Sequence, residues 1–306
     1  MAVTEATKKP KSGNAGNANG LTPSEASPTL KHREAFMFVA GLKPRQLQQI
    51  AIVEMDGAIG QRLKAAEYVK LFRQIEDNPR IRAVVLDIDS PGGSATGSNY
   101  LHLGVQSLMR KKPVVAFIRG LGASGAYLLA CPTSKIVAIP SAIIGSIGVI
   151  SMRPMVYEAL GRVGVHMNVT KSAEHKDMGS MFREPTPEEQ QKEQALVDDL
   201  YDQFLDSVAE GRKMDKARVK EVATGEVYTA RKAKELGLVD ELGDLERAID
   251  IAAELGEVPR RTVWMHPRRG LREVVSQLVA GSLVGEIGMQ LEERLLSSRY
   301  DPQHRI

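Results

Sequence analysis

Short apolar runs alternate with segments of helical period along the first half of the chain. Residues 49–55, 81–89 and 113–118 are apolar and rich in β-branched side chains, a composition typical of buried strands. Residues 64–76 carry apolar side chains at helical spacing, and we expect a second helix over residues 95–110. This order predicts an α/β fold with a mainly parallel sheet and right-handed crossovers.

The second half of the chain predicts longer helices and shorter strands. Thr186-Pro187 is a typical helix start, and we expect the longest helix over residues 188–212. A glycine-punctuated turn at residues 145–150 is expected to lead into a strand, and the polar loop 171–177 to follow a strand over residues 165–170. The remaining elements expected are strands at 135–139 and 238–239 and helices at 154–163, 215–223, 228–236 and 244–255.

Composition divides the chain into three parts. Residues 1–31 are rich in Lys, Ser, Thr, Gly, Asn and Pro, so we assign residues 1–47 to a disordered tail and its lead-in. Residues 48–256 form the α/β domain. Residues 257–306 combine an arginine cluster with apolar positions at helical spacing. This basic, amphipathic appendage suits a partner subunit or an anionic membrane surface, or it packs on the core as an ordinary tail helix.

Charge and cysteine content exclude several classes of protein. The chain has 306 residues, 42% of them hydrophobic, and a net charge of +3, so it shows no basic signal for nucleic acid. Its one cysteine, Cys131, excludes disulfides within the chain and C-x-x-C metal clusters. The apolar segments 35–42 and 274–285 are shorter than the roughly 20 residues of a spanning helix. With no secretory signal visible, we expect a cytoplasmic protein, at most peripheral at a membrane.

A candidate nucleophile stands where the third predicted strand ends. In R-G-L-G-A-S-G-A-Y, residues 119–127, Ser124 lies between small residues at a strand-to-helix turn. The free N–H groups and the helix dipole at such a turn suit an oxyanion. The alternative is that Ser124 is only the N-cap of the helix.

A second glycine turn strengthens the catalytic interpretation. The strand at residues 81–89 ends in Ser-Pro-Gly-Gly, and ligands bind at the carboxyl ends of strands in open α/β sheets. We therefore expect an oxyanion hole made by the N–H groups of Gly93 and Gly125. Both turns also have a purely structural interpretation.

The base for a serine nucleophile is not decided by these patterns. None of the histidines lies in a convincing Ser-His-Asp context, and triads are defined by geometry rather than by order. The alternative is lysine, which must lose its proton, and burial among apolar groups favours this. The loop 171–177, K-S-A-E-H-K-D, offers Lys171 and Lys176. The histidines of the chain are His32, His102, His166, His175, His266 and His304.

Several motifs occur together in one order. They are D-I-D-S-P-G-G at 87–93, G-A-S-G-A-Y at 122–127, G-S-I-G-V at 145–149, K-S-A-E-H-K-D at 171–177 and V-Y-T-A-R-K-A-K-E-L-G-L-V-D-E-L-G at 227–243. With them, the chain from about residue 49 to residue 256 resembles the signal peptide peptidase A family of serine peptidases. The resemblance implies a Clp-protease/crotonase-like fold of repeated β-β-α/β-α units.

The resemblance also implies roles for individual residues. Ser124 would be the nucleophile and Lys176 the general base of a Ser/Lys dyad, with Ser146 hydrogen-bonded to the lysine. No cofactor and no metal are implied, and the substrates would be extended, apolar peptides such as released signal peptides. The family includes double-length chains whose serine and lysine come from different halves, so this chain is expected to form a homo-oligomeric ring with sites completed between subunits.

Two other functions remain open from the sequence. A crotonase-like acyl-CoA enzyme shares the paired N–H oxyanion hole, but it would need carboxylates in its pocket and has no use for the dyad. An inactive scaffold of the same fold would not need Ser124, Lys176 and both glycine turns.

Overall fold

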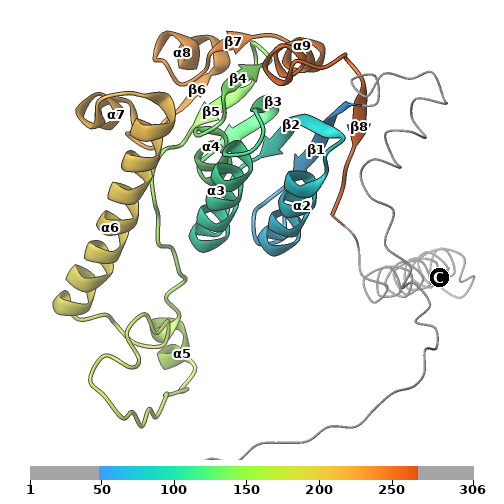
Figure 1. The fold of residues 1–306 in the computed structure, drawn as a ribbon. Helices are drawn as coiled ribbons and strands as arrows, with labels where there is room; N and C mark the ends of the chain where they lie inside the picture. The colour runs from blue at the N-terminus through green and yellow to red at the C-terminus, as the bar shows by residue number, and fades with distance from the viewer. Residues whose placement is uncertain (1–47, 268–306) are drawn as a thin grey trace, which may run out of the picture. The chain divides into compact units, whose positions relative to one another are not determined.

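A mainly parallel sheet forms the centre of the structure, a computed structural model that describes residues 48–267 (Figure 1). The segments expected as an N-terminal tail, residues 1–47, and as most of the C-terminal appendage, residues 268–306, lie outside these residues. The strands run in the order β6-β5-β3-β2-β1-β8, with β4 between β3 and β7, and only the β5–β6 pair is antiparallel. Their bounds are β1 Gln49–Asp56, β2 Ile81–Ser90, β3 Val114–Ala123, β4 Lys135–Ala138, β5 Ile143–Gly145, β6 Val227–Thr229, β7 Glu241–Leu242 and β8 Thr262–Trp264.

Helices connect these strands and confirm the expected α/β fold. The longest, α6, begins with a capping box in which Thr186 and Glu189 bond each other's backbone N–H groups. No helix among residues 48–267 is long and apolar enough to cross a membrane. The helices are α2 Ala65–Asp77, α3 Ala95–Met109, α4 Gly125–Ala130, α5 Tyr157–Arg162, α6 Pro187–Arg212, α7 Lys216–Val222, α8 Ala230–Glu235 and α9 Leu245–Gly256.

The sheet buries both of its faces, because alternate side chains of each strand point to opposite sides. In β1, Ala51 and Val53 join the larger core, which includes residues of α2, α3 and α4. Ile50 and Ile52 point the other way and pack with residues of α9. The same alternation continues through β2, β3 and β4, which explains why these strands appear in the sequence as continuous apolar runs.

Strand β3 changes its partner half-way along. Its residues 115–118 pair with β4, and its residues 121–123 pair with β5. On its other edge β3 pairs with β2, and the register of this pairing shifts after Ile88. Strand β3 therefore has a paired strand on each side, and Ser124 follows its last residue.

Three sequence-based expectations differ from the structure. The strand near residue 145 precedes the glycine turn, as β5, and the strand near residue 239 lies at Glu241–Leu242. Residues 165–170 form no strand and are all exposed, because no sheet edge of the described chain reaches them. In addition, residues 262–264 form the short strand β8, which pairs with β1 at the edge of the sheet.

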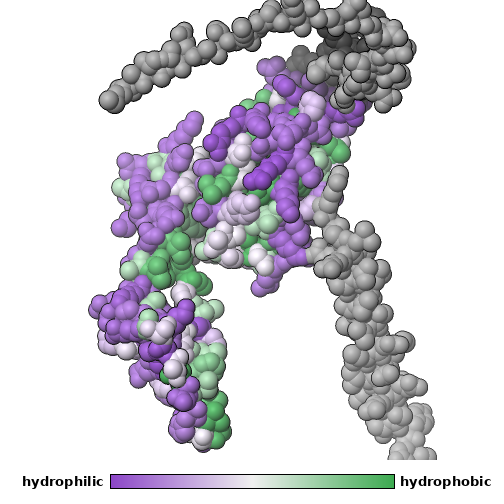
Figure 2. Space-filling model, turned by 60° about the horizontal axis from the view of Figure 1, so that its bottom comes forward, coloured by the Kyte–Doolittle hydropathy of each residue, from purple (hydrophilic) through white to green (hydrophobic). Residues whose placement is uncertain are grey.

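The segment between β5 and α6 extends away from the sheet (Figure 1). We call residues 151–186 the arm. Its hydrogen bonds join it to itself and to the first turns of α6, as between Arg153 and Glu193 at 2.6 Å and from Val156 N–H to the Met181 carbonyl at 2.9 Å. The arm also carries apolar side chains at its surface, and Figure 2 shows green, apolar surface along it.

The buried His102 predicts a pH dependence of stability. Its Nδ1 donates to the Leu128 carbonyl at 2.8 Å, and burial lowers its pKa. The folded state therefore prefers the neutral ring. Its stabilising contribution is complete above the unfolded pKa of about 6.5 and is lost as the pH falls below it. We expect the free energy of unfolding in urea to decline from pH 7.5 to pH 5.

A substitution isolates this contribution. His102→Gln should flatten the decline between pH 7.5 and pH 5 and cost about 1–2 kcal/mol at pH 7.5. His166→Gln, at an exposed position of the arm, should leave the decline unchanged. Equal pH profiles for wild type and His102→Gln would contradict the assignment.

Candidate active site

The backbone of Ser124 adopts a conformation that few residues other than glycine adopt. Its φ is 54° and its ψ is −124°, at the turn from β3 into α4. Lys213 and Glu257 also have positive φ, but they are ordinary left-handed helix C-caps. A strained serine between a strand and a helix is the geometry of a nucleophile held with its hydroxyl exposed. Strain of this kind persists only where the surroundings enforce it.

The side chain of Ser124 does not cap the helix. Its hydroxyl forms no cap hydrogen bond, whereas its carbonyl accepts from Tyr127 and Leu128 at 2.9 and 3.0 Å. The N–H of Ser124 donates to the Gly145 carbonyl at 2.8 Å, which continues the pairing of β3 with β5. The N-cap alternative therefore does not account for the hydroxyl, which is left available for chemistry.

Two glycines allow the turns to meet around Ser124. A Cβ on Gly92 would lie 2.6 Å from the nitrogen of Gly125 and 2.9 Å from the Cβ of Ser124. A Cβ on Gly125 would lie 2.0 Å from Oγ of Ser98. Because real side chains cannot make such contacts, both positions require glycine.

The two amides expected to form the oxyanion hole are not used by the fold. Ile59 forms a parallel bridge with the second turn, donating to the Gly92 carbonyl and accepting from Ser94. In such a bridge the N–H of Gly93 points away from Ile59. Gly125 is the first residue of α4, so its N–H has no partner within the helix. Neither amide donates a hydrogen bond to another residue within 48–267.

Ser146 lies beside Ser124 in the register of the sheet. Gly145 pairs with Ala123, so the two serines follow paired residues at the carboxyl ends of neighbouring strands. Ser146 also has a positive φ, 48°, and its N–H donates to the Glu226 carbonyl at 2.7 Å. Both serines are half-buried.

The structure does not bring Lys176 to Ser124. Lys176 lies in the arm, is exposed, and its ammonium group has no hydrogen bond or ion pair with the residues the structure describes. Lys171, the other lysine of this loop, is occupied, because its Nζ donates to the Glu174 carbonyl and to Asp177, each at 2.7 Å. The two lysines of this loop therefore differ in their contacts within the described chain.

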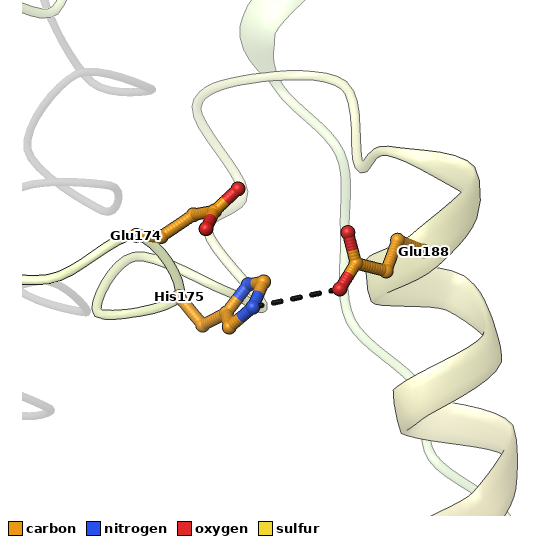
Figure 3. Close-up of side chains that lie close together, drawn as sticks. All are labelled: Glu174, His175 and Glu188. Carbon is orange, nitrogen blue, oxygen red and sulfur yellow. Dashed lines mark ion pairs between the residues drawn. The ribbon is translucent and has the colours of Figure 1, made fainter.

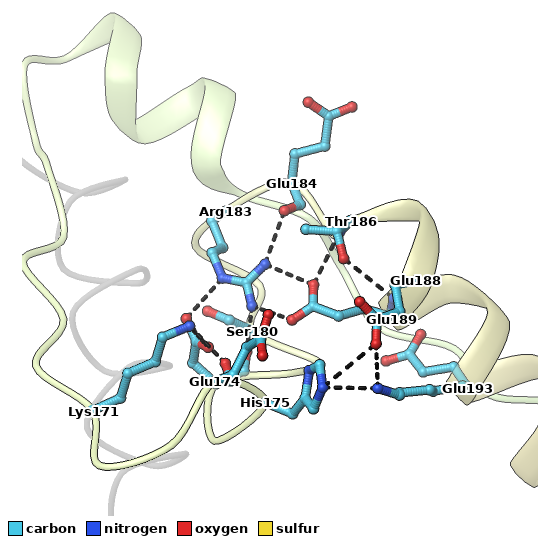
Figure 4. Close-up of polar contacts among 12 residues, drawn as sticks. Lys171, Glu174, His175, Ser180, Arg183, Glu184, Thr186, Glu188, Glu189 and Glu193 are labelled. Atoms are coloured by element: carbon cyan, nitrogen blue, oxygen red, sulfur yellow. Dashed lines mark hydrogen bonds and ion pairs between the residues drawn. The ribbon is translucent and has the colours of Figure 1, made fainter.

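An ion-pair network fixes the loop that carries Lys176 (Figure 4). Arg183 donates to Asp177 at 2.7 Å and to Glu189, the capping-box residue of α6, at 2.8 Å. Arg183 holds the pKa of the Asp177 carboxyl well below its usual range and lowers that of Glu189 to about 2. The loop is thereby tied to the start of α6, and the Lys176 side chain takes no part in this network.

A cluster of Glu174, His175 and Glu188 has the donor types of a metal site (Figure 3). The ammonium group of Lys192 already supplies a positive charge to this cluster, because the Lys192 Nζ lies 2.7 Å from Nε2 of His175 and 2.5 Å from the Glu188 carboxylate. We assign no metal to it. The same contacts occupy His175, and His102 is occupied by Leu128, so neither imidazole is placed as a base for Ser124.

Comparison with known proteins places the chain among peptidases. The model of peptidase family S49 matches residues 106–259. The chain is 36% identical over 204 residues to putative protease MJ0651 of Methanocaldococcus jannaschii, covering 66% of each chain. It is 37% identical over 234 residues to putative protease slr0021 of Synechocystis, covering 76% of this chain and 84% of that protein. It is 30% identical over 222 residues to the chloroplastic serine protease SPPA of Arabidopsis thaliana, covering 69% of this chain and 33% of that protein.

The chain belongs to peptidase family S49, the signal peptide peptidase A family that its motifs predicted. It is a serine-type peptidase by family, and its mainly parallel α/β sheet is consistent with the Clp/crotonase-like fold. The chain spans about two-thirds of the first of these relatives and one-third of the plant relative.

The contact at Gly125 predicts a specific loss of stability. Gly125→Ala would force a methyl group against Ser98, and we expect it to lower the free energy of unfolding by about 1–3 kcal/mol. Ser98→Gly removes the colliding side chain, so the double variant should be more stable than the sum of the single effects predicts. Urea unfolding of the four proteins measures this coupling. Gly161→Ala, where a Cβ meets nothing within 4 Å, is the control and should not lower the free energy of unfolding.

Proposed function

We propose that the protein is a serine endopeptidase in which Ser124 is the nucleophile and Lys176 of a neighbouring subunit is the general base. The strained turn of Ser124, with two unused amides beside it, is the observation that supports this proposal most directly. An acyl-CoA enzyme of related fold would leave this strained serine without a role.

Each group has a defined part in the reaction. The Ser124 hydroxyl attacks the carbonyl carbon of the scissile peptide bond and passes its proton to the neutral lysine. The N–H groups of Gly93 and Gly125 donate to the oxyanion that develops on the former carbonyl oxygen. The protonated lysine then gives its proton to the leaving amine. A water molecule, activated by the lysine, releases the acyl group from Ser124 and restores both residues.

A neighbouring subunit would supply what the isolated chain lacks. Lys176 is exposed in the structure, whereas a lysine base must be neutral, and burial in an interface disfavours its charged form. Apolar side chains that a single chain leaves exposed would be covered in the same interface. On the arm and just before it, these are Ile150, Met152, Met155, Val163, Val165, Met167, Val169 and Phe182, and on α6 they are Leu196 and Leu200.

The proposed assembly is a closed ring. An interface that joins the arm of one subunit to the serine turn of the next is heterologous, and such interfaces either close into rings or extend as filaments. The proposed substrates are extended, apolar peptides such as released signal peptides. In this proposal the peptide would lie beside the segment that follows Ser146, which begins Ile147-Gly148-Val149.

The dyad is tested by substitution and labelling. Ser124→Ala should abolish peptide hydrolysis and fluorophosphonate labelling, and Lys176→Arg should be inactive because guanidinium stays charged. Lys171→Arg and Ser172→Ala, in the same loop, should retain most activity. Hydrolysis of a peptide substrate and mass spectrometry of the labelled residue are the measurements. An active Ser124→Ala variant would reject the nucleophile, and an active Lys176→Arg variant would reject the base.

Mixed assemblies test whether the site is shared. Ser124→Ala and Lys176→Ala subunits, each inactive alone, are unfolded together and refolded in equal amounts. If the dyad is shared, about a quarter of the interfaces in mixed rings join an intact serine to an intact lysine, and activity should approach that fraction.

A second mixture serves as the control. Wild type and the Ser124→Ala/Lys176→Ala double variant, refolded in equal amounts, should give about a quarter of full activity for a shared site and about half for a site within one subunit. Mixed rings confirmed by native mass spectrometry but without activity in the first mixture would exclude the shared dyad.

A further inference from the structure

The strand that leads to Ser124 contains a bulge. Ile118 of β3 pairs with Ile88 of β2, and Gly122 pairs with Ser90. Between these pairs β2 has one residue, Asp89, whereas β3 has Arg119, Gly120 and Leu121. Extra residues of this kind bend a strand and change the direction in which it continues.

The carboxylate of Asp89 contacts all three residues of this bulge. Its Oδ1 accepts from the N–H of Leu121 at 2.9 Å, and its Oδ2 lies 3.7 Å from Nε of Arg119. A Cβ on Gly120 would lie 2.7 Å from Oδ1, so glycine is needed where the chain passes the carboxylate. The carboxylate of Asp89 thus accepts from the Leu121 N–H in place of the backbone carbonyl that a regular parallel pairing would have provided.

The bulge decides where Ser124 lies. Residues 121–123 are the part of β3 that pairs with β5, and Ser124 follows them directly. The hydrogen bond from Asp89 therefore acts on the first residue of the segment whose last step is the strained serine turn.

Arg119 has partners besides Asp89. Its guanidinium lies 3.5 Å from Glu54 and 3.8 Å from the buried Asp87. Loss of the charge of Asp89 alone therefore leaves the guanidinium with two carboxylates. The interaction specific to Asp89 is its hydrogen bond to Leu121.

We propose that Asp89 is a positioning residue for the nucleophile: its Oδ1 holds Leu121 in the bulge that aims the β3 chain end at the site of Ser124. It touches neither the reacting atoms nor Ser124 itself. The proposal rests on the function proposed for Ser124.

Two substitutions separate the hydrogen bond from the charge. Asp89→Ala removes the acceptor, and we expect the rate of fluorophosphonate labelling of Ser124, and kcat for a peptide, to fall about 10- to 100-fold with KM little changed. Asp89→Asn keeps an oxygen acceptor for Leu121 and should stay within about 3-fold of wild type, as a conservative rescue of the hydrogen bond.

Asp56→Ala is the matched control. Asp56 ends the neighbouring strand β1, pairs in register with Asp89 and is similarly half-exposed, but its carboxylate pairs with Arg62 at 2.9 Å instead of contacting β3. Its labelling rate should equal that of wild type. Thermal unfolding and native mass spectrometry establish that each variant is folded and assembled.

Hydrogen exchange provides a measurement independent of catalysis. In Asp89→Ala the amide of Leu121 should exchange about 10-fold faster than in wild type or Asp56→Ala.

Wild-type labelling by Asp89→Ala, or an equal loss in Asp89→Asn, would overturn the proposal. Should Asp89→Ala not fold, the near-isosteric Asp89→Asn still decides, since a loss above 10-fold in that folded variant would overturn it. If wild type is not labelled at Ser124 although the Leu121 amide responds as expected, the proposed function fails while the structural role of Asp89 stands.

Discussion

The close approach of two glycine turns is the constraint on which the site depends. Gly92 and Gly125 meet where any side chain would collide with backbone or with Ser98, and between them Ser124 keeps a φ of 54°. A strained backbone needs surroundings that hold it, and here these are the pairing of β3 with β5 and the buried helix α4. The same approach leaves the amides of Gly93 and Gly125 unused by the fold. Strain at the serine and free donors beside it therefore have one structural origin.

Much of this arrangement could be predicted from the sequence, because buried strands appear as apolar runs and helices as periodic ones. Ser124, Gly93 and Gly125 were predicted as site residues since turns at the carboxyl ends of parallel strands collect at one edge. The bulge of β3 could not be predicted, because it depends on a hydrogen bond between Asp89 and Leu121, 32 residues apart. Strand β8 has three residues and a partner more than 200 residues away, which leaves little local signal.

The segment at residues 165–170 shows a different reason for failure. Its alternation of Val165, Met167 and Val169 with polar residues is typical of a strand, yet all six residues are exposed and none pairs with a strand of the described chain. A periodic pattern records which face is apolar, but it does not say where a sheet edge lies. The pattern and the exposure are reconciled if the face is covered by another subunit, which agrees with the site proposed for Lys176.

A dyad divided between subunits would couple three properties: association of the subunits, the neutral form of the lysine and peptide cleavage. The network of Asp177, Arg183 and Glu189 holds the lysine loop on α6 whether or not a partner is present, so the loop would enter an interface already ordered. Burial of the arm's apolar side chains would favour association, and the same burial would favour the neutral form of the lysine. A free subunit would then hold a strained serine and an oxyanion hole without a base. Peptide cleavage would begin only on assembly, because the interaction that joins the subunits would also remove water from the lysine proposed as the base.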